Sequence, residues 1–531
     1  MTASPPPPAT AAAARRPERL AFALILVLTV LRVIAQFSSP FELYPDEAQY
    51  WLWSRTLDFG YFSKPPMVAW AIWATTHLGG GDAEGWVRLS APIFHGVAAA
   101  ALFAVGRRLY GGWTGLAAAA VYALMPGVQQ SSFIISTDAP LLCFLSLALL
   151  AYVSAADRAA RWAPAGLGAA LGLAMLSKYA AVFAVAGIGL HLLASPEARA
   201  AWDGRRALAA SAAFALALAP NLVWNATHGF ATVGHTAANA NLGGSLVHPG
   251  EMLGFLVEQF GVFGPIPFGV LAGVGLILAI RRRLTGPDLL LACWTAPPLA
   301  AVLVQAFLSR ANANWAASAY VAGSVLAAAW LTRDWPGRGR TAARVGLVAT
   351  VVLQGALAAF FIAAMIQPRL VDGIGQSNSI KRLRGWEDAS RAVIERARLE
   401  ALNGGVSAIA VDDRFLFNSL AYYGRDYFAV PDAPPLKVWV RGRAGNQAEV
   451  QAPLTPDLGN RVVLAILDDV KDRRLALAGR DFARTAGVSR YRDFTTLPCP
   501  PRAGESEERY NRRCLRRVTL LVAEGYRPAA E

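Results

Sequence analysis

The sequence is short of charged residues and of cysteine. Charged residues make up 16% of its 531 residues and hydrophobic residues 55%, whereas a soluble chain carries about a quarter charged residues. Repeated apolar runs of about 20 residues indicate transmembrane helices. Together these features exclude an ordinary soluble protein and predict a polytopic α-helical membrane protein. The chain also lacks the CxxC pattern that is typical of cysteine-rich zinc sites.

The few cysteines fall into two pairs of different character. Cys143 and Cys293 lie inside apolar runs, where we expect them to be small core residues. Cys499 and Cys514 lie in the polar C-terminal part of the chain. They could form a disulfide bond if that part is extracytoplasmic.

Negative charge is scarce as well, because 36 Asp and Glu face 50 Lys and Arg and leave a net charge of +14. In a soluble protein this excess would suggest nucleic acid as a partner. Here many arginines stand at the ends of apolar runs, where positive charge orients a chain in the bilayer. No basic, aromatic-interleaved module with the pattern of a nucleic-acid-binding element stands out. We therefore predict a membrane-embedded protein that does not bind nucleic acid.

The apolar runs predict about 11–13 transmembrane helices. The runs at 163–177 and 179–194 are short, so one of them could be a re-entrant or broken helix. Small-residue spacings within the runs indicate close helix packing, because the strand–turn–helix context of a phosphate-binding glycine loop is missing. These glycines are Gly166, Gly168, Gly172, Gly269, Gly273 and Gly275. The runs lie near residues 19–37, 87–106, 113–131, 137–154, 163–177, 179–194, 206–222, 255–280, 287–307, 314–331 and 343–366.

The positive-inside rule gives these spans an orientation. Residues 1–18 are of low complexity, and we predict a disordered cytoplasmic segment there, since Arg15, Arg16 and Arg19 flank the first span. The apolar run Leu20–Val33 continues without a clear cleavage site, so we expect a retained anchor and not a signal peptide. Every second loop is basic, which places the loops between them outside.

With an odd number of spans, the part from residue 368 to residue 531 also lies outside. Leu383–Leu402 has the charged and apolar faces of a helix. Several short runs rich in β-branched residues follow the pattern of strands, and they are Val406–Val411, Val438–Val440, Val462–Leu467 and Val518–Val522. We expect a small soluble α/β domain.

The first outward loop, residues 38–86, combines carboxylates with aromatic residues. Asp46 and Glu47 lie shortly after the first span, on its predicted outer side, and a solvated pair of loop carboxylates is the alternative to a functional site. The aromatic residues favour a location at the membrane interface, and they are Tyr50, Trp51, Trp53, Phe59, Tyr61 and Phe62. Such a loop could meet a lipid-borne substrate.

Three further charged residues lie on the predicted outer side of the membrane. Lys64 is a compact cation able to bind phosphate, and it precedes a predicted interfacial helix at Met67–His77. Asp138 and Lys178 lie at the ends of spans, where an ionisable group is costly and indicates function. Alternatively, Asp138 caps its helix and Lys178 extends towards the interface.

Later outward loops offer supporting polar groups. His228 and His235 could be metal ligands or plain loop histidines, and Asn225 precedes them in the same loop. Arg310 and Asn314 stand at the mouth of a later span.

Five short motifs carry a resemblance to a known family. "YPDEAQYW", "GYFSKPPMVAW", "STDAPLL", "LSKYA" and "NANWAASAY" occur in this order up to Tyr320. In order and spacing they resemble the bacterial GT-C glycosyltransferases of the protein mannosyltransferase type. That group includes transferases that add aminoarabinose or galacturonic acid to lipid A. The C-terminal part of the chain is not covered by these motifs.

The resemblance implies a transmembrane GT-C catalytic domain over 19–367 and a periplasmic α/β domain over 368–531. By position it makes Asp46 the catalytic carboxylate and Lys64 the ligand of a polyprenyl phosphate. We add Lys178 and Arg310 as further phosphate-binding cations. Other predicted active-site residues are Glu47, Tyr61, Asp138, Asn225, His235 and Asn314.

One residue departs from the resemblance. The aminoarabinose transferase has a glutamate that helps to hold a metal directly before its lysine, and Ser63 stands at that position here. The sugar and the use of a divalent metal ion are therefore left open, with Asp46 and His235 as candidate ligands.

The sequence thus predicts an inverting glycosyltransferase, because a single carboxylate base implies a one-step displacement. It would move a sugar from a polyprenyl phosphate to lipid A, another envelope glycolipid or a protein, on the periplasmic face of the inner membrane. A secondary transporter would explain intramembrane charge but predicts internal repeats, which we do not find. A non-catalytic sensor or scaffold would leave the loop at 38–86 without a role.

Overall fold

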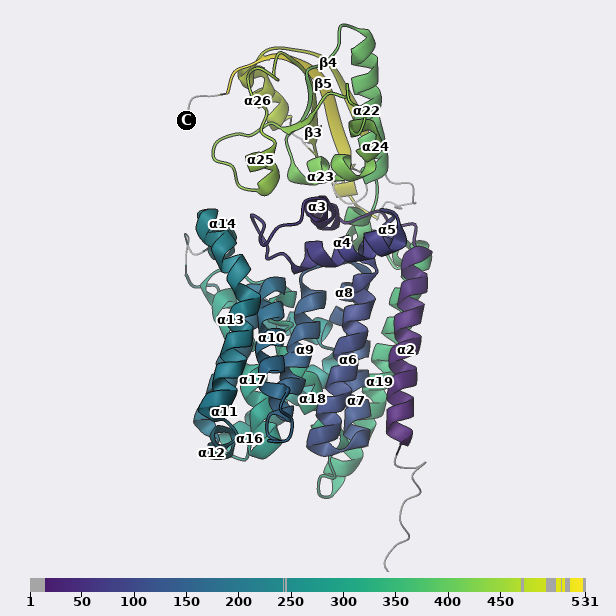
Figure 1. Ribbon diagram of the computed structural model, residues 1–531. Helices are drawn as coiled ribbons and strands as arrows, with labels where there is room; N and C mark the ends of the chain where they lie inside the picture. The colour runs from purple at the N-terminus through teal and green to yellow at the C-terminus, as the bar shows by residue number, and fades with distance from the viewer. Residues whose placement is uncertain are drawn as a thin grey trace, which may run out of the picture. The chain divides into compact units, whose positions relative to one another are not determined.

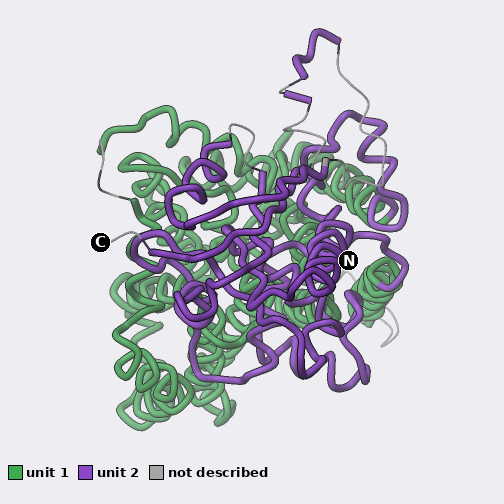
Figure 2. Tube along the Cα trace, turned by 90° about the horizontal axis from the view of Figure 1, so that it is seen from above, with its two compact units in different colours: residues 1–36, 64–68, 88–362 green, residues 37–63, 69–87, 363–531 purple. Residues whose placement is uncertain are grey.

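The computed structural model describes residues 15–241, 243, 246–468, 472–492, 503–507, 509–510 and 516–528. The chain divides into two compact units, which Figure 2 draws in different colours. Unit 1 comprises Met1–Gln36, Lys64–Val68 and Arg88–Ile362, and unit 2 comprises Phe37–Ser63, Ala69–Val87 and Ala363–Glu531. Most of the loop at 38–86 therefore belongs to the same unit as the C-terminal part of the chain.

Unit 1 is built from helices that pack side by side (Figure 1). Helix α6 packs against α7 and α9, and α10 packs against α9 and α13. The helices are α2 (Arg16–Phe37), α6 (Ser90–Tyr110), α7 (Gly112–Leu124), α8 (Pro126–Phe133), α9 (Asp138–Ser154), α10 (Ala163–Ser177), η1 (Tyr179–Ala181), α11 (Val182–Ala194), α12 (Pro196–Ala200), α13 (Gly204–Thr227), α14 (Ala231–Ala238), α15 (Pro249–Val262), α16 (Pro265–Ile280), α17 (Gly286–Leu308), η2 (Ala313–Ala316), α18 (Ala319–Thr332) and α19 (Arg338–Ile366).

The apolar runs of the sequence coincide with these helices. By length and composition, five helices in the described part of the chain could cross a membrane, and they are Arg16–Phe37, Glu84–Tyr110, Gly204–Thr227, Gly286–Leu308 and Arg338–Ile366. Shorter apolar helices cover the other predicted spans, at Gly112–Leu124, Asp138–Ser154, Ala163–Ser177, Tyr179–Ala194, Pro265–Ile280 and Ala319–Thr332. The predicted multi-pass helical fold is confirmed.

Several of the predicted spans divide between helices in the structure, and two of these breaks follow directly from the local sequence. The run at 113–131 divides between α7 and α8 at Met125, because Pro126 disfavours a helical conformation of the residue before it. The run at 255–280 divides between α15 and α16, where Gly264 has a φ of 101° that is open to glycine. An apolar run extends across such breaks, so it could not reveal them.

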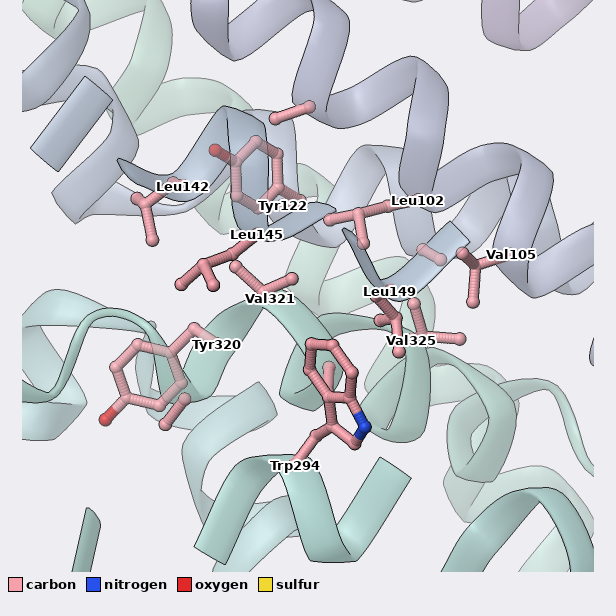
Figure 3. Close-up of a cluster of buried hydrophobic side chains, with 14 of the residues drawn as sticks. Leu102, Val105, Tyr122, Leu142, Leu145, Leu149, Trp294, Tyr320, Val321 and Val325 are labelled. Carbon is pink, nitrogen blue, oxygen red and sulfur yellow. The ribbon is translucent and has the colours of Figure 1, made fainter. Parts of the chain in front are cut away.

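The core of unit 1 is a cluster of buried apolar side chains around α18. Figure 3 shows part of this cluster, to which α9 contributes Leu145 and Leu149 and α18 contributes Val321 and Val325. Every residue of α18 from Ala319 to Leu331 is buried. A helix that is buried all round is a core element and not a surface helix, and α6, α7, α9, α16 and α17 pack against α18.

Unit 2 contains a five-stranded sheet with the strand order β2-β1-β3-β5-β4. Strands β2, β1 and β3 are parallel, while β5 is antiparallel to both β3 and β4. The strands are β1 (Ala408–Val411), β2 (Leu436–Val438), β3 (Arg461–Leu467), β4 (Phe482–Arg492) and β5 (Arg517–Tyr526). The helices of the C-terminal part are α20 (Arg369–Gly373), α21 (Ser377–Ile380), η3 (Lys381–Leu383), α22 (Trp386–Leu402), α23 (Arg414–Tyr423), α24 (Arg425–Phe428), α25 (Gln447–Gln451) and α26 (Arg473–Asp481).

Both faces of this sheet are covered by apolar side chains. Ile409 and Val411 face a cluster that includes residues of α22 and α23. Ala408 and Ala410 face the opposite cluster, which includes Ala478 of α26. This alternation is the period of two expected of a strand. The predicted C-terminal α/β fold is confirmed, with α22 and most of the strands close to their expected positions.

The prediction missed strand β4. Its sequence, FARTAGVSRYR, has arginines and a glycine where a continuous apolar run would indicate a strand. The strand forms at the edge of the sheet because its backbone pairs with the buried strand β5. Pairing with a neighbour can therefore override a weak local signal.

The loop at 38–86 forms three helices, α3 (Pro45–Ser54), α4 (Met67–Gly79) and α5 (Glu84–Arg88). The predicted helix at Met67–His77 is confirmed as α4. The expected membrane-facing aromatic belt is wrong for most of its members, because Tyr50, Trp51, Trp53 and Tyr61 are buried. Trp53 stacks on Tyr61 with ring centroids 4.7 Å apart, so these rings form the interior of the loop.

Two predictions fall partly or wholly outside the described residues. Of the segment predicted at 1–18, residues 1–14 are not described and α2 already begins at Arg16. Cys499 and Cys514 also lie outside the described residues. Cys143 is buried, as expected of a core residue, and Cys293 is half-buried.

A buried ion pair within unit 2 yields a stability prediction. Arg384 and Asp372 form two hydrogen bonds of 3.1 Å, with side chains only 6% and 5% exposed. Asp372→Asn would leave the arginine charge buried without its partner, so we expect a loss of about 3–5 kcal/mol in the free energy of unfolding. Denaturant unfolding of the purified protein measures this loss.

The matched control is an exposed ion pair of the same unit. Arg391 and Glu387 lie 3.2 Å apart with side chains 60% and 57% exposed. Glu387→Gln should cost about 0–1 kcal/mol, since solvent screens such pairs. Equal losses for the two variants would contradict the assignment of a stabilising buried pair.

Candidate active site

The ends of three helical segments in unit 1 meet at a buried carboxylate. Asp138 begins α9, Lys178 follows the last residue of α10, and Asn314 lies in η2. The Lys178 Nζ is 2.7 Å from Asp138 Oδ1, and Asn314 Nδ2 donates to Asp138 Oδ2 at 2.8 Å. The side chains of Lys178 and Asp138 are 22% and 11% exposed, which makes this a largely buried pair.

A second lysine acts on the same carboxylate. Lys64 belongs to unit 1 and interacts electrostatically with Asp138. Two cations around one carboxylate leave an excess of positive charge. Such an excess at the ends of apolar helices suits an anion carried by a lipid, and a lysine ammonium binds phosphate as a point charge.

A polar cluster lies next to Lys178 along the chain. The hydroxyl of Tyr179 donates to Asn221 Oδ1 at 3.0 Å, and Asn225 Nδ2 donates to that hydroxyl at 3.1 Å. Asn221 and Asn225 are both buried in α13. Asn225 was predicted from the sequence, whereas Tyr179 and Asn221 were not. The signal was available, because two asparagines four residues apart share one face of an apolar helix.

The remaining site candidates of unit 1 are not among the described partners of the Asp138 side chain. His235 is half-buried in α14, and Arg310 has an exposed side chain in the segment after α17. The hydrogen-bond and ion-pair partners described for the Asp138 side chain are Lys178 and Asn314, so Arg310 is not among them.

The predicted catalytic carboxylate belongs to unit 2. Asp46 lies in the first turn of α3, where Pro45 occupies a favoured helix-starting position. Its Oδ1 is 3.4 Å from Nη1 of Arg414, and both side chains are 37% exposed. A carboxylate with this exposure is accessible to a substrate while a nearby cation holds it.

The side chains of Glu47 and Tyr61 make contacts that support α3 and the loop around it. Glu47 is fully buried, and its Oε2 accepts a hydrogen bond of 2.8 Å from the backbone N–H of Tyr44 at the start of α3. The Tyr61 hydroxyl lies 3.0 Å from the carbonyl oxygen of Trp53. Burial raises the pKa of Tyr61 to about 12, so this phenol stays protonated and supports the loop.

A protein-held divalent metal ion would need several carboxylate, imidazole or thiolate ligands. Among the described residues, no group of three or more His, Cys, Asp or Glu side chains could hold a metal ion. Ser63 offers a hydroxyl where a carboxylate ligand would be needed. We derive no step through a metal ion.

Comparison with known proteins decides the family. The family model "dolichyl-phosphate-mannose-protein mannosyltransferase" matches residues 63–224. The lipid A galacturonosyltransferase RgtD of Rhizobium johnstonii is 37% identical over 412 residues, which are 77% of this chain and 83% of RgtD. The chain belongs to the bacterial GT-C glycosyltransferases. The resemblance noted in the sequence is confirmed, and the transporter and scaffold alternatives are set aside.

The fold of this glycosyltransferase has solved counterparts. The crystal structure of ArnT from Cupriavidus metallidurans bound to undecaprenyl phosphate matches with a TM-score of 0.63 at 16% identity, covering 94% of this chain and 97% of that chain. The apo form of ArnT matches with a TM-score of 0.61 at 17% identity and the same coverage. At such identities the likeness concerns the fold.

The buried pair of this glycosyltransferase yields a second prediction. Lys178→Met removes the ion-pair partner in direct contact with Asp138, and Asp138→Asn removes the partner of Lys178, so each variant should cost about 3–5 kcal/mol of unfolding free energy. The double variant removes both charges and should be close to wild type in stability. Unfolding of the detergent-purified variants measures these differences.

An assay of sugar transfer by the double variant then distinguishes a structural role of the ion pair from a role in the reaction. We expect transfer to fall by more than about tenfold, since one lost charged hydrogen bond is worth roughly 1.5–3 kcal/mol. A double variant that is stable and transfers sugar at the wild-type rate would show that the pair only holds helices together.

Proposed function

We propose that this glycosyltransferase moves a sugar from a polyprenyl phosphate to lipid A on the periplasmic face of the bacterial inner membrane. The observation that carries the proposal is the pair of lysines, Lys64 and Lys178, around the single carboxylate of Asp138. The likeness to RgtD, a lipid A galacturonosyltransferase, favours lipid A as acceptor and galacturonic acid as the first sugar to test. The undecaprenyl phosphate bound to ArnT favours that lipid as carrier.

The donor half of the reaction needs positive charge. When the bond between the anomeric carbon and the phosphate oxygen breaks, the phosphate leaves with the electron pair. Phosphate is a stable leaving group, so cations that stabilise the developing charge contribute more than a general acid. Lys64 and Lys178 would take this role, and Arg310 could join them from its exposed position.

The acceptor half needs a base if the attacking group is a hydroxyl. Asp46 would accept the hydroxyl proton while the acceptor oxygen attacks the anomeric carbon opposite the leaving phosphate. A single displacement of this kind inverts the anomeric configuration, by analogy with inverting glycosidases. If the acceptor is itself a phosphate, it needs no base and Asp46 would orient it.

Other candidates would support these roles. Asn225 and Asn314 would bind the sugar or hold the residues that do, and His235 would contact substrate from α14. Glu47 and Tyr61 would act through the shape of α3 and its loop, since both are buried. The catalytic domain would extend over 19–367 and the periplasmic α/β domain over 368–531, with residues 1–18 in the cytoplasm.

The first test removes the proposed base. Asp46→Asn keeps the size of the side chain but cannot take a proton, so we expect kcat to fall by about 10²–10⁴-fold. The assay incubates purified protein with galacturonic acid on undecaprenyl phosphate and with lipid A, and measures the lipid A mass. Asp58→Asn, in the same loop, is the matched control and should retain activity. A fully active Asp46→Asn variant would refute the base assignment.

The second test concerns orientation. Asn403 follows α22 and is exposed, so a cysteine there should react with a membrane-impermeant maleimide in intact cells. The experiment uses a background in which the four native cysteines are replaced by serine. Arg205→Cys, in a predicted cytoplasmic loop, should react only after permeabilisation. The reverse pattern would overturn the predicted periplasmic face.

A further inference from the structure

We propose that Arg414, in the C-terminal part of the chain, is a positioning residue for Asp46. The inference deepens the proposed function and rests on it, because it takes Asp46 as the base. It assigns an indirect part in catalysis, through Asp46, to a region that carries no catalytic motif. The evidence lies entirely within unit 2, to which both residues belong.

Arg414 contacts two residues on one face of α3. Its Nη1 donates to Gln49 Oε1 at 3.0 Å and lies 3.4 Å from Asp46 Oδ1. Asp46 and Gln49 are three residues apart in a helix, so their side chains are neighbours. The hydrogen bond to Gln49 fixes the guanidinium, and the fixed guanidinium then attracts Asp46 into one orientation.

The distance between Arg414 and Asp46 leaves the carboxylate of Asp46 able to act as a base. A charge-assisted hydrogen bond between nitrogen and a carboxylate oxygen is about 2.7–2.9 Å long, and the distance here is 3.4 Å. Arg414 therefore attracts the carboxylate without forming a full hydrogen bond to it. A general base must keep an oxygen lone pair for the incoming proton, and this arrangement preserves that capacity.

The position of Arg414 is itself well defined. It is the first residue of α23, and the preceding Asp413 caps this helix by accepting a hydrogen bond of 2.7 Å from the N–H of Phe415. The guanidinium of Arg414 lies over the Phe415 ring, 4.5 Å from its centroid. Leu416 and Leu420 of the same helix are fully buried. Because the helix is capped and one of its faces is buried, the backbone of Arg414 is held in a fixed position.

A second arginine acts on the same end of α3. Arg382 Nη1 donates to the hydroxyl of Tyr44 at 2.7 Å, and Arg382 interacts electrostatically with Asp46. Its guanidinium also lies over the Phe415 ring, 5.7 Å from the centroid. One phenylalanine ring thus contacts both arginines that surround the first turn of α3.

Helix α23 also holds the far end of α3. Trp51 and Tyr422 meet edge to face with ring centroids 4.9 Å apart, and the Tyr422 hydroxyl donates to the carbonyl oxygen of Asp82 in the same loop. Contacts at Asp46, Gln49 and Trp51 follow the length of α3. The two helices therefore pack along each other, and α3 cannot rotate without breaking these contacts.

Arg414→Gln tests the proposal, because it removes the charge and keeps a polar side chain. We expect kcat to fall about 10- to 100-fold with little change in the KM for the polyprenyl-phosphate galacturonic acid donor, since small misplacements of a catalytic group have effects of this size. An exposed ion pair contributes little to stability, so Tm should fall by no more than about 4 °C. Arg414→Lys keeps the charge and should recover most of the loss.

The matched control is the ion pair between Arg490 and Asp472 in the same unit, 3.0 Å long with side chains 41% and 43% exposed. Arg490→Gln should leave both kcat and Tm close to wild type. If Arg490→Gln lowers kcat as much as Arg414→Gln does, the effect is general to unit 2 and the proposal is wrong.

A double variant shows whether Arg414 acts through Asp46. In the Asp46→Asn background, Arg414→Gln should reduce residual transfer by less than about twofold, because coupled residues are not additive. Full additivity would overturn the proposal, and so would wild-type kcat in Arg414→Gln. If Asp46→Asn itself were fully active, the proposed function of Asp46 would fail, and this outcome is distinct from failure at Arg414.

Discussion

A charge at the end of an apolar helix has to be paired, and this constraint organises unit 1. An isolated carboxylate in apolar surroundings is costly, and Asp138 begins a helix that is buried along most of its length. Lys178 and Asn314 come from segments far away in the sequence. Lys178 neutralises the charge of Asp138, and Asn314 donates a hydrogen bond to it. The need for these partners holds the ends of α9, α10 and η2 together. The cations that could receive a lipid phosphate are thereby fixed at one place.

Close packing of small residues makes that convergence possible. A Cβ atom added at Gly168 of α10 would lie 1.9 Å from the carbonyl oxygen of Ala210 in α13, and one at Gly172 would lie 2.5 Å from the side chain of Ala217. Glycine therefore lets the two helix backbones approach each other, as in many membrane helix pairs. This approach brings Tyr179, directly after Lys178, within hydrogen-bond reach of Asn221 and Asn225.

Sequence alone revealed the helices and the type of chemistry, but it did not reveal the surroundings of the residues. Apolar runs identified α9 and α10, and the cost of intramembrane charge singled out Asp138 and Lys178. The period of a helix shows which face is apolar and not what covers it, so Trp51 and Trp53 suggested a membrane interface. In unit 2 these side chains are buried by other protein residues, and some of those lie hundreds of positions away in the sequence, such as Tyr422 against Trp51. No local pattern records that pairing, and the same holds for Arg414 beside Asp46.

Helix α3 explains why the loop and the C-terminal part fold as one unit. It has only 10 residues, and an isolated helix shorter than about 12–15 residues is marginal in water. Its stability must come from tertiary contacts, and α23 supplies them by packing along α3, as in the ring contact between Tyr422 and Trp51. The orientation of Asp46 therefore depends on a folded sheet domain more than 360 residues further along the chain. A domain with no catalytic motif of its own is in this way a structural requirement for the proposed base.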